Sequence, residues 1–211
     1  MRKLIQRLQD GVVYGLRSSL GFIAGFAALA AGGQIVGSQW AFLGAILVTP
    51  FFSLGAIVVH EFGHAAGARL AGMRVNRIVV ADFAWSPKTR KWSAARRPPD
   101  ASDIGGWVEA SEGPRGASRM GDTLFVLGGP LANILASVIC VLPATYLPSP
   151  LAGIFGGFVL FSMTLALANL IPSRMNGAAS DGLQLWRIWR PHRRRKPPKP
   201  SRSGWKRTPD F

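Results

Sequence analysis

Two long windows of the chain contain no Lys or Arg, and this feature limits the possible fold more than any other. The windows cover residues 18–68 and 121–173, and their only acidic residues are Glu61 and Asp122. All 25 Lys and Arg residues lie outside the windows, in residues 2–17, 69–119 and 174–207. An ionised side chain at the centre of a bilayer costs at least about 2.5–3.5 kcal/mol. The cleared windows therefore predict segments that cross a membrane.

The composition supports the same class of protein. Charged residues make up 17% of the chain, and the mean hydropathy is +0.22. Soluble domains average about 25% charged residues. The formal net charge is nevertheless +15, so the apolar and the basic parts of the chain are separated in sequence.

Each window is long enough for two spans, because one span requires about 20 apolar residues. We expect an all-α polytopic membrane protein with about four transmembrane helices, at residues 13–36, 41–70, 122–147 and 151–172. The segments "GGQIVGSQW" and "LPSP" are the expected turns. Pro50 lies inside the second span, and the sequence leaves open whether it kinks or breaks the helix.

The polar residues 73–120 predict a small β-containing segment between the second and third spans. We expect one strand in "VNRIVVADFAW", a second in "IGGWVEAS", and a loop in "RRPPDASD" between them.

The distribution of basic residues predicts the topology, because Lys and Arg gather on the cytoplasmic side. Residues 1–12 would form a basic cytoplasmic amino-terminus, residues 13–185 the transmembrane domain, and residues 186–211 a basic disordered cytoplasmic tail. Such a tail can bind anionic lipid, at about 1 kcal/mol per basic residue near the surface. Nucleic acid is not an expected partner, since no folded basic module is visible.

The stretch "HEFGH", residues 60–64, places titratable groups inside the second span. His60 and His64 are four residues apart and share one helix face, so both rings can bind one cation. The pattern H-E-x-x-H is typical of two zinc ligands with a glutamate, Glu61, as general base. Polar groups within a span are functional by default.

A catalytic zinc ion requires a third protein ligand and one open position. His192, the remaining histidine, lies beside three arginines whose charge opposes a dication. The third ligand should therefore be a carboxylate, and Asp181 and Asp122 are the main candidates. Their spacing in the sequence favours Asp181 only modestly.

Three segments together resemble the site-2 protease family of intramembrane zinc metalloproteases. They are "HEFGH", "GGPLANI" (residues 128–134) and "NLIP…SDG" (residues 169–182). The resemblance implies one Zn²⁺ held by His60, His64 and Asp181, with Glu61 as general base. The chain has "SRMNGAASDG" where family members commonly have prolines and a leucine before Asp-Gly.

The resemblance also implies residues that position the substrate. Asn133 would pack near the site, and Gly105 and Gly106 would begin a strand that guides an extended substrate. We expect Asn169 to contribute too. An interhelical hydrogen bond without a catalytic role is the alternative for both asparagines.

The leading hypothesis is an intramembrane zinc endopeptidase that cuts a membrane-spanning protein near the cytoplasmic face, in a bacterial cell membrane. One alternative is a zinc-binding membrane scaffold or sensor on the same fold, although Glu61 has no purpose in a protein that only binds metal. Another is an ion or proton carrier that uses the histidines and the glutamate.

Overall fold

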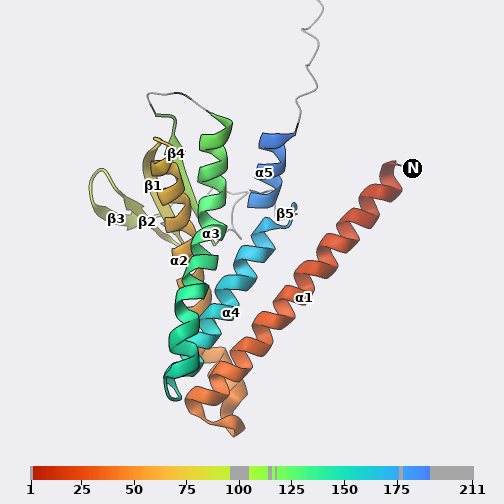
Figure 1. Cartoon of the computed structure of the whole chain (residues 1–211), viewed down its shortest axis with the longest axis vertical. Helices are drawn as coiled ribbons and strands as arrows, with labels where there is room; N and C mark the ends of the chain where they lie inside the picture. The colour runs from red at the N-terminus through yellow and green to blue at the C-terminus, as the bar shows by residue number, and fades with distance from the viewer. Residues whose placement is uncertain (1, 96–104, 114–115, 117, 176–177, 191–211) are drawn as a thin grey trace, which may run out of the picture.

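The computed structural model describes the chain except residues 1, 96–104, 114–115, 117, 176–177 and 191–211 (Figure 1). Four long helices dominate it: α1 (Arg2–Val36), α2 (Ala41–Leu70), α3 (Arg119–Tyr146) and α4 (Leu151–Leu170). Each contributes to a stretch long and apolar enough to cross a membrane, which confirms the predicted fold class. These stretches are Ser18–Val36, Ser38–Leu70, Arg119–Tyr146 and Leu151–Leu170.

Helices α2, α3 and α4 pack together, while the amino-terminal half of α1 leans away from them (Figure 1). Glycines allow the closest approaches. A Cβ atom on Gly63 of α2 would overlap the carbonyl oxygen of Gly128 on α3. Small residues are favoured at such crossings, because association in a membrane depends on close packing.

The connection between α1 and α2 is shorter than the predicted turn. Helix α1 continues to Val36, so residues 32–36 of "GGQIVGSQW" are helical. Gly37 then adopts a φ of 95°, and the short 3₁₀ helix η1 (Ser38–Trp40) leads into α2. Helix α2 runs through Pro50 without a break, so the structure excludes a broken helix at that residue.

A four-stranded antiparallel sheet lies between α2 and α3 in the chain. Its strands are β1 (Arg74–Val80), β2 (Phe83–Ser86), β3 (Lys91–Ala94) and β4 (Gly106–Ser111), in the order β3-β2-β1-β4. Strand β4 pairs with β1 alone, in a register that places Gly106 opposite Val80. The second edge of β4 has no strand partner among the described residues.

The prediction of one strand in "VNRIVVADFAW" was wrong, because the segment folds back at Ala81 and Asp82 to give β1 and β2. Ala81 adopts a φ of 50°, which an alanine rarely does, and its N–H donates to the carbonyl of Gly105 at 2.8 Å. That contact holds the turn where the sequence has neither Gly nor Pro. The predicted loop "RRPPDASD" lies outside the described residues.

After α4 the chain forms a two-stranded hairpin and one more helix. The hairpin pairs β5 (Arg174–Met175) with β6 (Ala178–Ala179), and helix α5 spans Asp181–Trp189. Helix α5 enters the segment that we expected to be a disordered tail from residue 186, so the boundary at that residue was wrong. Residues 191–211 lie beyond the described part of the chain, and their disorder stays a prediction.

Candidate metal centre

The two histidines of "HEFGH" lie one turn apart on α2 and turn their rings toward one point. Their side chains are buried, and 4% of His60 and 8% of His64 is exposed. The ring centroids are 4.7 Å apart and the planes nearly perpendicular. The Nε2 atoms lie 3.1 Å from each other.

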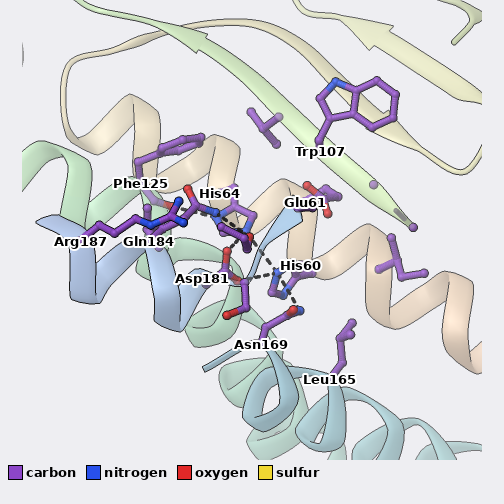
Figure 2. Close-up of a pocket in the computed structure, with 18 residues that line it drawn as sticks. His60, Glu61, His64, Trp107, Phe125, Leu165, Asn169, Asp181, Gln184 and Arg187 are labelled. Carbon is purple, nitrogen blue, oxygen red and sulfur yellow. Dashed lines mark hydrogen bonds and ion pairs between the residues drawn. The ribbon is translucent and has the colours of Figure 1, made fainter. Parts of the chain in front are cut away.

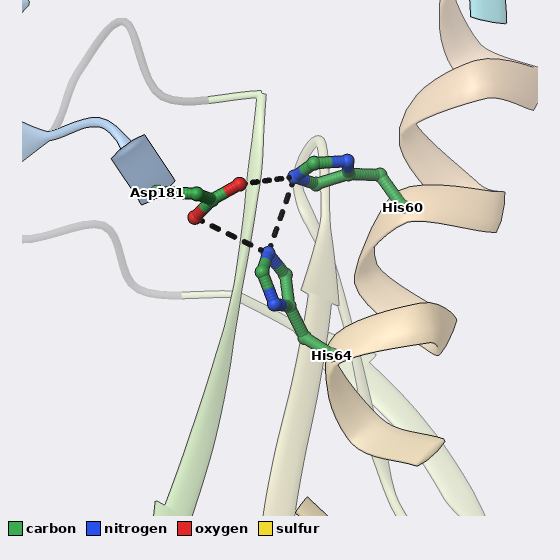
Figure 3. A group of neighbouring side chains, drawn as sticks. All are labelled: His60, His64 and Asp181. Atoms are coloured by element: carbon green, nitrogen blue, oxygen red, sulfur yellow. Dashed lines mark hydrogen bonds and ion pairs between the residues drawn. The ribbon is translucent and has the colours of Figure 1, made fainter. Parts of the chain in front are cut away.

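Asp181, the first residue of α5, completes the group (Figure 3). Its Oδ2 atom is 3.1 Å from His60 Nε2, and its Oδ1 atom is 3.5 Å from His64 Nε2. These three residues form a group that could hold a metal ion, and Asp122 is not part of it. The sequence left Asp181 and Asp122 as candidates for the third metal ligand, and the fold brings Asp181 to the histidines.

Local hydrogen bonds place Asp181 at the end of α4. Ser180 caps α5 by accepting from the N–H of Leu183 at 3.2 Å, and its hydroxyl donates to the carbonyl of Ile171 at 2.8 Å. The backbone N–H of Ser180 donates to the carbonyl of Ser173 at 3.0 Å. The hairpin of "SRMNGAASDG" therefore starts and ends at fixed points beside the site.

The electrostatic setting of Asp181 favours its ionised form. Burial acts to raise the pKa of this carboxyl group, but hydrogen bonds and charge interactions with His60 and His64 together outweigh burial and lower the pKa below its ordinary value. A carboxylate must be ionised to bind a metal ion.

The residues present fit a zinc ion. Donor atoms at the corners of a zinc tetrahedron, with bonds of 2.0–2.1 Å, are about 3.3 Å apart. Here the two Nε2 atoms are 3.1 Å apart, His60 Nε2 is 3.1 Å from Asp181 Oδ2, and one donor atom from each of the three residues lies within 4.8 Å of the others. Two imidazoles and a carboxylate are a donor set of catalytic zinc sites. A Cβ atom on Gly129 of α3 would lie 2.5 Å from His64 Nε2 and 2.8 Å from His60 Nε2, so only glycine leaves room beside the donor atoms.

Glu61 lies beside this group with one oxygen unpaired. Its side chain is buried, and Oε2 has no hydrogen-bond partner in the described structure. Figure 2 shows Glu61 next to strand β4. A buried carboxylate oxygen without a partner costs free energy, which makes it a candidate for a functional group.

The metal-binding group and Glu61 open into a pocket of about 630 Å³ (Figure 2). Strand β4 lines one side of the pocket, and β6 and α5 line another. Of the four residues predicted to position the substrate, Gly105, Gly106 and Asn169 line this pocket. Asn133 does not, because it is fully buried behind His60.

Several contributors to the site were absent from the sequence-based prediction. The carbonyl of Phe125 accepts a hydrogen bond from Nδ1 of His64 at 2.9 Å. Gln184 and Arg187 of α5 line the pocket. A backbone carbonyl carries no signal in a sequence, whereas the two side chains follow Asp181 at intervals of three residues along a helix, which the sequence could have shown.

Comparison with protein families matches residues 51–150 to Peptidase family M50. The chain carries an M50 peptidase domain. The resemblance to the site-2 protease family is therefore confirmed for a metallopeptidase domain at residues 51–150, and the chain has a buried His-His-Asp candidate metal site. The matched residues of the M50 domain include "HEFGH" and Asn133, while Asp181 lies beyond them. Comparisons with curated proteins and with solved structures gave no match.

The M50 domain belongs to a chain with four candidate membrane-spanning helices, so the protein is an integral, multi-pass membrane protein. The family implies protein substrates.

Proposed function

We propose that the protein is an intramembrane zinc endopeptidase that hydrolyses a peptide bond of a membrane-spanning protein near the cytoplasmic face. One observation carries the proposal. Three buried metal-binding groups from α2 and α5 converge next to Glu61, whose Oε2 atom has no hydrogen-bond partner in the described structure, at the wall of a pocket.

His60, His64 and Asp181 would hold the zinc ion through Nε2, Nε2 and the carboxylate. When bound, zinc supplies a Lewis acid that makes water a nucleophile at neutral pH and polarises the substrate carbonyl. With three protein ligands the ion would have room for a water molecule, as catalytic zinc sites require.

Glu61 is the proposed general base. It follows His60 directly in the chain, and its Oε2 atom is free to accept a proton from the attacking water. The same oxygen can then donate that proton to the nitrogen of the leaving amine. Burial keeps bulk water from competing for this carboxylate.

The free edge of β4 is the proposed docking line for the substrate. A helical peptide bond is protected by its own hydrogen bonds, so the substrate must unwind locally, and pairing with a strand edge satisfies the freed backbone groups. Gly105 and Gly106 at the start of β4 lie at the pocket. Asn169 lines the pocket with its Nδ2 3.3 Å from His60 Nε2, and its proposed role is to donate to a substrate oxygen.

The position of His60 along α2 supports cleavage near one membrane surface. His60 lies about 28 Å from the start of α2 at the helical rise of 1.5 Å per residue, which is nearly the thickness of the hydrocarbon core. The proposed topology places the carboxyl-terminal end of α2 and both chain termini on the cytoplasmic side of a bacterial cell membrane. The Lys and Arg residues lie in or next to these segments, and such residues gather on the cytoplasmic side of a membrane. The tail would then face anionic lipid.

Reconstitution in liposomes tests the proposed function. The purified protein is incubated with a panel of membrane-spanning peptides, and mass spectrometry locates any cut. We expect cleavage that stops after zinc is removed by a chelator and returns when zinc is added back. Zinc binding without hydrolysis of any peptide would favour a scaffold or sensor. Ion flux that survives zinc removal would favour a carrier.

A further inference from the structure

We propose that Asn133 is a positioning residue for the metal centre: its side-chain carbonyl accepts the Nδ1 proton of His60 and so directs the lone pair of Nε2 to the metal. This role differs from the substrate contact that the sequence suggested. The inference rests on the zinc site of the proposed function, but not on proteolysis.

The first step is the placement of Asn133. It lies on α3 with none of its surface exposed, and its amide nitrogen is 3.3 Å from His60 Nδ1. It does not line the pocket. A side chain behind the ligand, on the side away from the pocket, cannot contact a substrate that occupies the pocket.

The second step concerns the two nitrogens of His60. Nε2 faces the metal position, since it lies 3.1 Å from both Asp181 Oδ2 and His64 Nε2. A neutral imidazole carries one proton, and a ring that binds metal through Nε2 carries it on Nδ1. That proton requires an acceptor, because metal-binding histidines almost always donate their other N–H.

His64 provides a comparison within the same site. Its Nδ1 atom is 2.9 Å from the carbonyl oxygen of Phe125, which can only accept. His64 Nδ1 must therefore carry the proton, and Nε2 of the neutral ring is free to bind metal. Helix α3 supplies both acceptors, a backbone carbonyl for His64 and the Asn133 side chain for His60.

The third step is the orientation of the Asn133 amide. With Nδ2 toward His60, the amide would donate to Nδ1 and force the ring proton onto Nε2, where it would block the metal. In that orientation the Oδ1 atom is buried without a partner. Amide oxygen and nitrogen are nearly equal in shape, so a rotation of 180° fits the same space and gives Nδ1 its acceptor. The rotation places Nδ2, which carries two N–H groups, where Oδ1 had no partner. The orientation is therefore set by the requirement of metal binding and not by the number of hydrogen bonds.

Neighbouring hydroxyls hold the Asn133 backbone in place. Ser137 of α3 and Ser162 of α4 both donate to the carbonyl oxygen of Asn133, at 2.9 and 3.2 Å. Ser137 also approaches the carbonyl of Val159 at 3.2 Å. These contacts link α3 to α4 at the level of His60 and hold the backbone from which the amide extends.

Zinc affinity of the full-length protein in detergent, measured by competition with a chelator, tests this role. Asn133→Leu keeps the number of side-chain heavy atoms and the branch point but has no acceptor, and we expect zinc binding about 10- to 100-fold weaker. Asn133→Asp restores an acceptor of the same shape, and we expect affinity close to that of the unchanged protein. The visible spectrum of bound Co²⁺ should change in Asn133→Leu and not in Asn133→Asp.

Asn76→Leu is the matched control, since Asn76 is exposed on β1 and lies outside the candidate metal group. We expect this variant to retain zinc affinity. The proposal is overturned if Asn133→Leu binds zinc as tightly as the unchanged protein, or if Asn133→Asp loses affinity to the same extent as Asn133→Leu. Asn133→Ala replaces the leucine variant if that variant does not fold. If the variants show the expected zinc affinities but the unchanged protein has no peptidase activity, the proposed function is overturned and the role of Asn133 is not.

Discussion

Gly106 lies directly against Glu61. A Cβ atom on Gly106 would lie 2.6 Å from Glu61 Cγ and 2.7 Å from the carbonyl oxygen of Val79. The strand edge proposed to bind substrate and the proposed general base are thus in van der Waals contact. This close approach is possible because Gly106 has no Cβ atom.

Replacement of Gly106 by Ala should therefore impair catalysis without removing zinc. The added methyl must displace either Glu61 or β4, and a misplacement of about 1 Å can cost about 10²-fold in rate. We expect a fall in kcat of that order with unchanged zinc content, measured by peptide cleavage and metal analysis. Gly156→Ala is the control, because nothing lies within 4 Å of a Cβ atom at that position. Equal rates for the two variants would contradict the proposed contact.

Replacement of Gly129 by Ala should act on the metal instead. The new Cβ atom would lie 2.5 Å from His64 Nε2, so the ring must turn away from the metal position. We expect zinc affinity to fall at least about tenfold, as for other changes that disturb the orientation of a ligand. Chelator competition measures this. Retention of full affinity would show that the α3 backbone does not confine the rings.

Asp181 and Asp122 can be separated by the same assay. Asp181→Asn removes the carboxylate that lies 3.1 Å from His60 Nε2, and we expect the loss of stoichiometric zinc. Asp122→Asn changes an acidic residue in the first turn of α3, outside the candidate metal group, and should leave zinc content unchanged. The opposite pattern would assign the third ligand to Asp122.

Much of the fold follows from where charge is missing. Residues 18–68 and 121–173 could be divided into four spans because ionised groups are costly in a bilayer. The face shared by His60 and His64 also follows from helical periodicity alone. These features depend on local sequence, so they could be predicted.

Other features depend on contacts between distant segments. The turn at Ala81 has no Gly or Pro, and a hydrogen bond to Gly105 holds it in place. The location of Asn133 behind His60, rather than in the pocket, results from the crossing of α2 and α3. The resemblance to the site-2 protease family ranks Asp181 above the other carboxylates as a metal ligand. Its distance to the histidine rings, however, depends on how α5 packs and could not be obtained from the sequence.

The most direct test of the account is a paired measurement on Glu61→Gln and the unchanged protein, in the same liposomes. Zinc content and peptide cleavage are measured on each preparation. The account predicts one zinc per chain in both proteins, with cleavage abolished in the glutamine variant, because the amide cannot take up the proton. Cleavage by Glu61→Gln at the unchanged rate, or an active unchanged protein that contains no zinc, would contradict it.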